Sequence, residues 1–354
     1  MTTLTERPLT KFGNPDGLTA AAPPEHRGVP RDGVRLLVAA DGITHARFRD
    51  LPRFLRPGDL LVVNTSATVP GELDAVRSAA GPLVLHAATE LDDGTWVVEL
   101  RSAPDAEKPV LDASAGEVIA VAAGISLTLV APYPHAGSAP VGGGNRLWRA
   151  RVHGALRSTL DRHGRAIAYG YLDRSYPIED YQTVFGLHPG SAEMPSAARP
   201  FTHELVTRLV SSGVMVAPVT LHTGVSSQDA GEAPQPERFE VTPATARLVN
   251  MTKAAGGRVV AVGTTSTRAL ESATGRDGVV TPAAGWTERV ITPDDPARVV
   301  DGLVSGWHNP DASHLLLVES VAGPALTQQA YAEAFAHGYL WHEFGDSSLF
   351  LPHD

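Results

Sequence analysis

Residues 256–272 read Gly256-Gly257-Arg258-Val259-Val260-Ala261-Val262-Gly263-Thr264-Thr265-Ser266-Thr267-Arg268-Ala269-Leu270-Glu271-Ser272. The apolar run 259–262 is too short for a helix and has glycines on both sides, which is typical of a buried parallel strand. Residues 267–272 favour a helix, so residues 263–266 are predicted to form the turn between strand and helix. Such a turn directs free backbone N–H groups and the positive end of the helix dipole to one place.

The hydroxyl groups of this turn, with Arg268 close behind them, suit a carboxylate or a phosphate. The alternative is that Thr265 or Ser266 only caps the helix, because Ser and Thr are common N-cap residues. Both interpretations stay open on the turn alone.

The same alternation of short apolar runs and helical patterns occupies both ends of the chain. Strands are predicted at 34–39, 60–64, 215–221 and 314–321, and helical patterns at 46–55, 155–163, 202–212, 243–255, 295–305 and 325–337. This alternation predicts the α/β class, with a mostly parallel sheet and helices on its faces.

The middle of the chain has a different character. Short β-rich runs at 82–87, 95–100, 118–121, 126–130 and 146–152 follow one another without helices, which predicts a small all-β barrel or sandwich. The Gly142-Gly143-Gly144 run is predicted to be a hairpin tip or linker without a ligand role. We therefore expect a discontinuous α/β domain of residues 1–70 and 155–354, interrupted by a barrel-like domain of residues 71–154.

Composition narrows the class of protein. The 354 residues include no cysteine, which excludes disulfides, cysteine-bound zinc and a thiol nucleophile. No apolar run approaches the roughly 18 residues of a membrane span, and the N-terminus lacks a signal-peptide pattern, so we expect a cytoplasmic protein without a membrane partner. The formal net charge is −10 and basic residues are scattered, so the charge balance does not by itself indicate a nucleic-acid partner.

Common catalytic motifs are missing from the sequence, including phosphate loops, the G-x-S-x-G elbow and H-E-x-x-H. The 14 histidines show no metal-ligand spacing, so we expect no metal. Polar residues instead recur near the ends of predicted strands: Asn64 and Ser66, His222 and Thr223, residues 264–268, His308 and Asn309, and Glu319 and Ser320. Any one histidine alone is more readily a surface or core residue, but parallel strand ends converge on one crevice.

Several longer motifs occur along the chain. They are residues 55–64 (Leu-Arg-Pro-Gly-Asp-Leu-Leu-Val-Val-Asn), residues 181–185 (Tyr-Gln-Thr-Val-Phe), Thr220-Leu221-His222, residues 237–241 (Glu-Arg-Phe-Glu-Val), the 257–272 block, and Gly338-Tyr339 with Gly345-Asp346. With these motifs the chain resembles, over nearly its whole length, the S-adenosylmethionine:tRNA ribosyltransferase-isomerase (QueA) family of queuosine biosynthesis.

The resemblance implies S-adenosylmethionine as co-substrate, without a metal. The family transfers and rearranges its ribosyl group onto the aminomethyl group of a deazaguanine base in tRNA, and methionine and adenine leave. Because the sulfonium acidifies the adjacent ribose methylene, a modest general base suffices to deprotonate it. We expect His222 to transfer this proton, with Asp346 and Glu237 as alternatives. The expected substrate-binding residues are Asn64, Ser66, Tyr181, Gln182, Phe201, Thr202, Arg238, Gly263, Thr264, Thr265, Ser266, Arg268 and His308.

The chain also departs from the family pattern. Residues 64–73 lack an acid and two arginines that the family has there, and residues 198–200 replace a glycine and a histidine. Glu72 and Asp229 add negative charge, which weakens the charge-assisted contacts with phosphates that favour binding of tRNA. Three interpretations therefore stay open: the tRNA-modifying enzyme, a relative that uses S-adenosylmethionine on a small acceptor or cleaves it, and a non-catalytic S-adenosylmethionine-binding protein.

Overall fold

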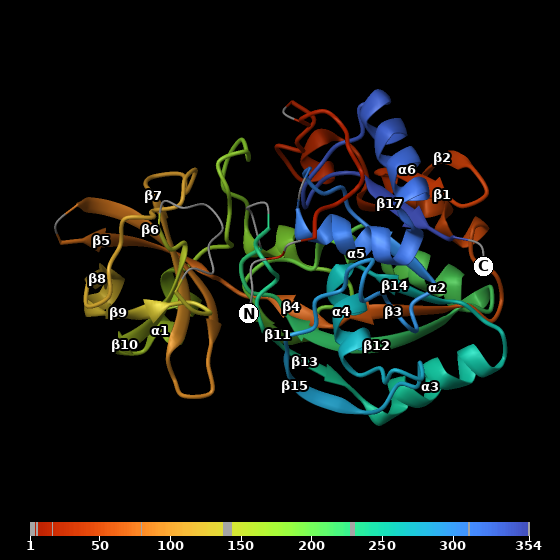
Figure 1. Ribbon diagram of the computed structural model, residues 1–354. Coiled ribbons are helices and arrows are strands. Elements are labelled where there is room, and N and C mark those ends of the chain that lie inside the picture. The colour runs from red at the N-terminus through yellow and green to blue at the C-terminus, as the bar shows by residue number, and fades with distance from the viewer. Residues whose placement is uncertain are drawn as a thin grey trace.

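Figure 1 shows the structure, a computed structural model in which a small barrel lies beside a larger sheet covered by helices. It describes residues 4, 6–15, 17–78, 80–136, 144–226, 231–310 and 312–352, so Gly142, Gly143 and Asp229 lie outside the described residues. The α/β class with an all-β insertion is confirmed. Among the described residues, every helix is too short or too polar to cross a membrane.

The larger sheet is built from strands at both ends of the chain. Its strands are β1 (Arg35–Ala39), β2 (Ile43–Arg47), β3 (Leu60–Asn64), β12 (Met215–His222), β13 (Glu237–Val241), β14 (Val259–Val262), β15 (Ala283–Thr287), β16 (Gly302–Ser305) and β17 (Ser347–Phe350). They are arranged in the order β15-β13-β12-β3-β14-β16-β17-β1-β2. The four neighbours β12, β3, β14 and β16 are parallel, as are β17 and β1. The other pairs are antiparallel, so the sheet is mixed with a parallel centre.

Both faces of the parallel centre are buried, because alternate residues of each strand enter different apolar clusters. Leu60 and Val62 pack on one face, whereas Leu61 and Val63 pack on the other. The first face is covered by α3 (Pro243–Ala254), α4 (Thr264–Ser272), α5 (Ser313–Ala322) and α6 (Pro324–Ala336). The second face is covered by α2 (His203–Ser211) and the 3-10 helix η3 (Phe48–Arg53).

The barrel is closed by six antiparallel strands in the order β10-β7-β6-β5-β8-β9. They are β5 (Glu72–Arg77), β6 (Gly81–Glu90), β7 (Trp96–Ser102), β8 (Val118–Val121), β9 (Ser126–Pro132) and β10 (Leu147–His153). Helix α1 (Leu156–His163) packs Leu156 and Leu160 into the barrel core. The sequence patterns had indicated five of these strands and missed β5. The division into domains at residues 70/71 and 154/155 stays a prediction.

Two predicted elements are wrong. Residues 314–321 are not a strand but part of helix α5, whose Leu315, Leu316 and Leu317 are all buried. A helix that is buried on all sides shows no 3.6-residue period, so its apolar run looks like a strand. Residues 295–305 are not a helix: the chain is irregular up to residue 301 and β16 follows. The N–H groups of residues 298–300 donate to the Glu271 carboxylate instead of forming a helical turn.

Two helix boundaries differ by smaller amounts. The helical pattern at 46–55 is the short η3, and α4 already begins at Thr264 rather than at residue 267. Because residues 302–305 form a strand and residues 314–321 belong to a helix, His308 follows the strand β16 instead of preceding a strand. Glu319 and Ser320 lie within α5, where the Glu319 carboxylate accepts hydrogen bonds from the N–H groups of Leu9 and Thr10.

Candidate active site

The carboxyl ends of four parallel strands lie at one edge of the sheet. β12, β3, β14 and β16 are neighbours in that order, and they end at His222, Asn64, Val262 and Ser305. The residues that directly follow these strands are therefore close together, which is the usual position of a ligand in such sheets. Most of the polar residues expected at a site do gather here.

The turn after β14 forms the centre of this edge. Gly263 has a φ of 92°, and a Cβ at this position would lie 3.2 Å from the Cβ of Ala197. Both facts favour glycine. Because glycine is the N-cap of α4, no side chain caps the first turn of the helix. The Ser266 hydroxyl is buried, and it has no hydrogen-bond partner among the described residues. The turn thus keeps donors for an anionic group.

Asn64 fastens this turn to the neighbouring strand. Its Nδ2 donates to the carbonyl of Leu221 at 2.9 Å and to Thr265 Oγ1 at 3.3 Å, and its Oδ1 accepts from the Leu221 N–H at 3.0 Å. Oδ1 also accepts from the N–H of Ser66 at 3.0 Å. The amide is completely buried and fully used in these contacts. Asn64 therefore positions the site and has little capacity left to bind a ligand.

His222 is held at the end of β12 by two serines and a glycine. Its Nδ1 lies 2.7 Å from Ser66 Oγ, which in turn lies 2.6 Å from Ser191 Oγ. A Cβ on Gly190 would come within 2.5 Å of His222 Nδ1, so only glycine leaves room for the ring. Burial, helped by the charges of Arg238, His188 and Arg157, lowers the pKa of His222. The imidazole is therefore neutral at pH 7 and able to accept a proton.

A pocket of about 210 Å³ adjoins His222 between the barrel and the sheet. Its lining includes Trp96 and Glu90 of the barrel, Arg157 of α1, and Arg238 of β13. The Arg157 guanidinium lies 5.1 Å from the Trp96 ring centroid and 3.0 Å from Glu90. The pocket thus combines apolar walls with two arginines.

The Arg268 side chain is committed to neighbouring segments of the chain. It is 6% exposed and forms an ion pair with Glu237. Its Nη2 donates to the carbonyl of Gln235 at 2.7 Å and to that of Thr287 at 3.3 Å, and its Nε donates to the carbonyl of Arg289 at 2.9 Å. Burial raises the pKa of Glu237, while Arg268 opposes the rise. This pair holds the residues around β13 and β15 against α4.

The Asp346 carboxylate is likewise committed to neighbouring segments, although the residue lines a small crevice with Ala197 at the same edge of the sheet. Its carboxylate accepts from the backbone N–H of Arg35 at 2.7 Å, from the Arg35 Nε at 2.9 Å and from the N–H of Leu340 at 2.9 Å. The side chain is buried. Of the three residues considered for proton transfer, His222 lines the larger pocket, and its Nε2 has no hydrogen-bond partner among the described residues.

Three histidines gather beyond the end of β16. His308 stacks on His314 with ring centroids 4.9 Å apart, and its Nε2 lies 3.0 Å from Ser305 Oγ. Burial, helped by His314 and His342, holds the pKa of His308 well below its usual range. Burial also lowers the pKa of His342 to about 4. Burial, helped by the charge of Arg268, lowers the pKa of His314 to about 4 as well, so all three rings are neutral at pH 7.

Glu343 and Tyr171 are candidate site residues that the sequence did not indicate. The Tyr171 hydroxyl donates to Glu343, and the Tyr171 ring stacks on His342 with centroids 4.6 Å apart. Burial raises the pKa of Glu343 to about 7. Glu343 and His342 also line a small crevice with Ala197, next to the Gly263 turn. The signal in the sequence was a polar His-Glu pair between Trp341 and Phe344, but it matched no motif.

Of the remaining expected residues, four are packed or bonded within the protein, and Arg238 lines the pocket. Phe201 is completely buried in the core, and Thr202 caps α2 by accepting a hydrogen bond from the Leu205 N–H, so both are structural. Tyr181 is buried, and Gln182 bonds to the backbone of residue 68. Arg238 is half-exposed, pairs with Asp92 and lines the pocket beside His222.

Glu72 does not add negative charge to the surface as the sequence suggested. It is buried in the barrel wall, where it lies 2.9 Å from His86 Nε2 and 2.5 Å from Arg165 Nε. Its charge is therefore balanced inside the protein, and it does not repel an anionic partner at the surface.

Known proteins are similar to this chain over most of its length. The family model described as "Queuosine biosynthesis protein" matches residues 10–350. Proteins named S-adenosylmethionine:tRNA ribosyltransferase-isomerase are similar to this chain. The one from Acidiphilium cryptum is 38% identical, with 90% of this chain and 93% of that protein covered. The one from Thermus thermophilus is 37% identical, with 93% and 97% covered.

A solved structure is also similar. The crystal structure of S-adenosylmethionine tRNA ribosyltransferase from Thermotoga maritima has a TM-score of 0.52 and 27% sequence identity, and covers 96% of this chain and 99% of that one. The match extends over both the barrel and the sheet. The chain therefore belongs to the queuosine biosynthesis protein family.

Proposed function

We propose that this protein is an S-adenosylmethionine-dependent ribosyltransferase-isomerase that acts on a deazaguanine base of tRNA. Relatives with this name match the chain over nearly its whole length. The observation that carries the proposal is the connected strand-end site. Asn64 links the donor-rich turn at Thr265 to β12, whose last residue, His222, faces a pocket.

The turn after β14 would hold the amino-acid or ribose end of S-adenosylmethionine. The first N–H groups of α4 and the buried Ser266 hydroxyl are donors of the kind that a carboxylate or a ribose hydroxyl requires. Because Arg268 is occupied by Glu237 and three carbonyls, we assign it a positioning role instead of direct contact. The adjoining crevice has room for about one water molecule, at about 10 Å³, so binding requires the loops around it to separate.

His222 is the general base in this proposal. Ser66 fixes the ring through Nδ1, which leaves Nε2 to take a proton from the methylene beside the sulfonium. The lowered pKa keeps the ring unprotonated at neutral pH. The aminomethyl nitrogen of the base then forms a bond to the ribosyl group and loses a proton, while the bonds from this group to the methionine sulfur and to the adenine nitrogen break. Methionine leaves as a neutral thioether, and adenine takes up a proton as it leaves. Rigid placement of the reacting groups supplies much of the acceleration.

The pocket beside His222 would accept part of S-adenosylmethionine or the deazaguanine base with which it reacts. Its volume of about 210 Å³ is below the roughly 300–1,000 Å³ of sites that enclose a whole ligand, so it suits a ribose or a single base. Arg157 and Arg238 line this pocket and pair with Glu90 and Asp92, so an RNA phosphate would have to displace these acids to contact the arginines. Two paired arginines are a modest basic surface, consistent with the net charge of −10.

Product analysis tests the proposal. Purified protein is incubated with S-adenosylmethionine, with and without tRNA that carries the deazaguanine base, and the products are identified by mass spectrometry. The proposal predicts release of adenine and methionine together with a ribosyl-derived mass gain on the tRNA. Release of adenine or methionine with no change in the tRNA would indicate a small acceptor or cleavage of the co-substrate, and binding without products would indicate a non-catalytic protein.

A further inference from the structure

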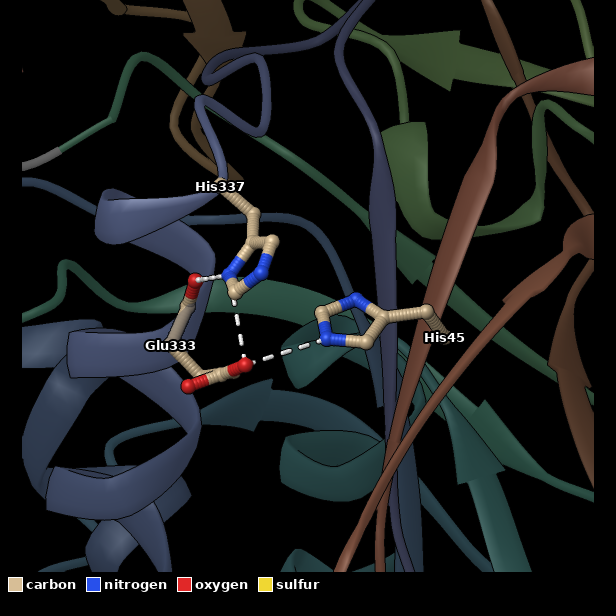
Figure 2. A group of neighbouring side chains, drawn as sticks. All are labelled: His45, Glu333 and His337. Carbon is tan, nitrogen blue, oxygen red and sulfur yellow. Dashed lines mark hydrogen bonds and ion pairs between the residues drawn. The ribbon is translucent and has the colours of Figure 1, made fainter.

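Three potential metal ligands meet at the far side of the sheet, away from the strand ends described above. His45 lies on the edge strand β2, Glu333 lies in the last turn of α6, and His337 is the C-cap of that helix. Figure 2 shows the Glu333 carboxylate beside both imidazole rings, whose centroids are 4.6 Å apart. The segments are almost 300 residues apart in the sequence, which is why the spacing of the histidines gave no sign of them.

The distances between the three ligand atoms fit a small cation. Glu333 Oε1 lies 3.2 Å from His45 Nε2 and 3.2 Å from His337 Nδ1, and all ligand atoms are within 4.8 Å of one another. Bonds of about 2.0–2.2 Å in tetrahedral geometry place neighbouring zinc ligands roughly 3.3–3.6 Å apart. Both nitrogen–oxygen distances are slightly below this range, and all three ligand atoms are near enough for small side-chain shifts to bring them into it.

Tyr339 orients one of the ligands. Its hydroxyl lies 2.8 Å from His45 Nδ1. When Nδ1 donates its proton to this oxygen, Nε2 carries the lone pair and faces Glu333. A hydrogen bond on the second ring nitrogen is the usual support of a metal-binding histidine. The Tyr339 hydroxyl supplies it before any cation arrives.

The electrostatic setting also favours a cation. α6 ends at Ala336, so the negative end of its dipole lies beside His337, and the protein as a whole carries a net charge of −10. His337 Nδ1 lies 3.0 Å from the carbonyl oxygen of Glu333. Because a carbonyl only accepts, this nitrogen carries a proton in the metal-free protein, and a cation can bind it only after the proton moves to Nε2. The nearby positive charge of Arg35 is balanced by Asp346, 2.7 Å away.

We propose that His45, Glu333 and His337 bind a divalent cation of the Zn²⁺ type. Two imidazole nitrogens and a carboxylate oxygen are ligands that Zn²⁺ and its neighbours in the transition series prefer, and water would complete the coordination. The bound ion would fasten the edge strand β2 to the end of α6. This site is separate from the proposed catalytic site and does not depend on the proposed function.

Calorimetric titration with zinc chloride tests the site. The full chain is used without a histidine tag, after removal of metals with a chelator. We expect one equivalent of zinc to bind to the wild type. Glu333→Gln and His337→Ala should each weaken the affinity at least tenfold, while His163→Ala, which removes an exposed histidine on α1, should leave it unchanged. Circular dichroism melting of each variant without zinc checks that the fold is intact.

Hydrogen exchange locates the ion independently of affinity. Zinc should slow amide exchange in residues 43–47 of the wild type and leave exchange in the same residues of Glu333→Gln unchanged. The proposal is overturned if the wild type shows no saturable binding. It is equally overturned if folded Glu333→Gln and His337→Ala bind zinc as tightly as the wild type, because the ion would then lie elsewhere, for example at His308 and His314.

Discussion

The role assigned to Arg268 can be tested by the substitution Arg268→Lys. The guanidinium reaches one carboxylate and three backbone carbonyls, which belong to residues 235, 287 and 289. A lysine ammonium can keep the ion pair with Glu237. Its donors lie on a single atom, so it cannot also donate hydrogen bonds to the separated carbonyls. At least two hydrogen bonds from a charged donor are lost.

The size of the effect follows from these contacts. A hydrogen bond to a charged group contributes about 1.5–3 kcal/mol, so the loss of two predicts that the free energy of unfolding falls by about 3–6 kcal/mol. Urea unfolding followed by the fluorescence of the five tryptophans measures this difference. Arg247→Lys on the exposed side of α3 is the matched control and should change the free energy by less than about 0.5 kcal/mol.

Unchanged stability of Arg268→Lys would refute the positioning role assigned to Arg268. If Arg268 contacts the ligand rather than the surrounding chain, Arg268→Lys would unfold at the same urea concentration as the wild type and would bind S-adenosylmethionine much more weakly. Equal stability of the two proteins would show that the four contacts of Arg268 do not hold this region together.

Two further substitutions test the site. Gly190→Ala places a Cβ 2.5 Å from His222 Nδ1, so kcat should fall at least tenfold while the melting temperature stays close to that of the wild type; an unchanged kcat would contradict the packing described. Burial raises the pKa of Glu343 from 4.5 to about 7. Its contribution to stability is therefore complete below pH 4.5 and lost as the pH rises through 7, by up to about 3 kcal/mol. Glu343→Gln should remove this part of the pH dependence in urea titrations at pH 5 and pH 8, and identical pH profiles would contradict it.

The sequence predicted the centre of the sheet well because those strands leave local signals. Residues 60–63 and 259–262 are short apolar runs between turn residues, and both are buried strands in the structure. Helix α5 was wrongly predicted as a strand, because a helix that is buried on all sides has no periodic pattern of apolar residues. β16 was missed because the segment before it is held by Glu271, which lies 27 residues before Arg298 in the sequence.

Polar residues at predicted strand ends were expected to meet at one edge of the sheet, and the structure does bring Asn64, Thr265 and His222 together there, beside a pocket. That this edge is the active site stays a proposal. The partners of Arg268 and Asp346 could not be predicted, because Glu237 and Arg35 reach them only through the tertiary fold. Glu343 likewise depends on Tyr171, which is 172 residues away in the sequence.

The most direct test of the account compares His222→Gln with the wild type in a single turnover. S-adenosylmethionine and tRNA with the deazaguanine base are supplied in excess of their dissociation constants, and adenine release is followed over time. The account predicts that His222→Gln binds S-adenosylmethionine as the wild type does and releases adenine about 10²–10⁴ times more slowly, the usual contribution of a general base. Release at the wild-type rate would contradict the assignment of His222 and the strand-end site on which it depends.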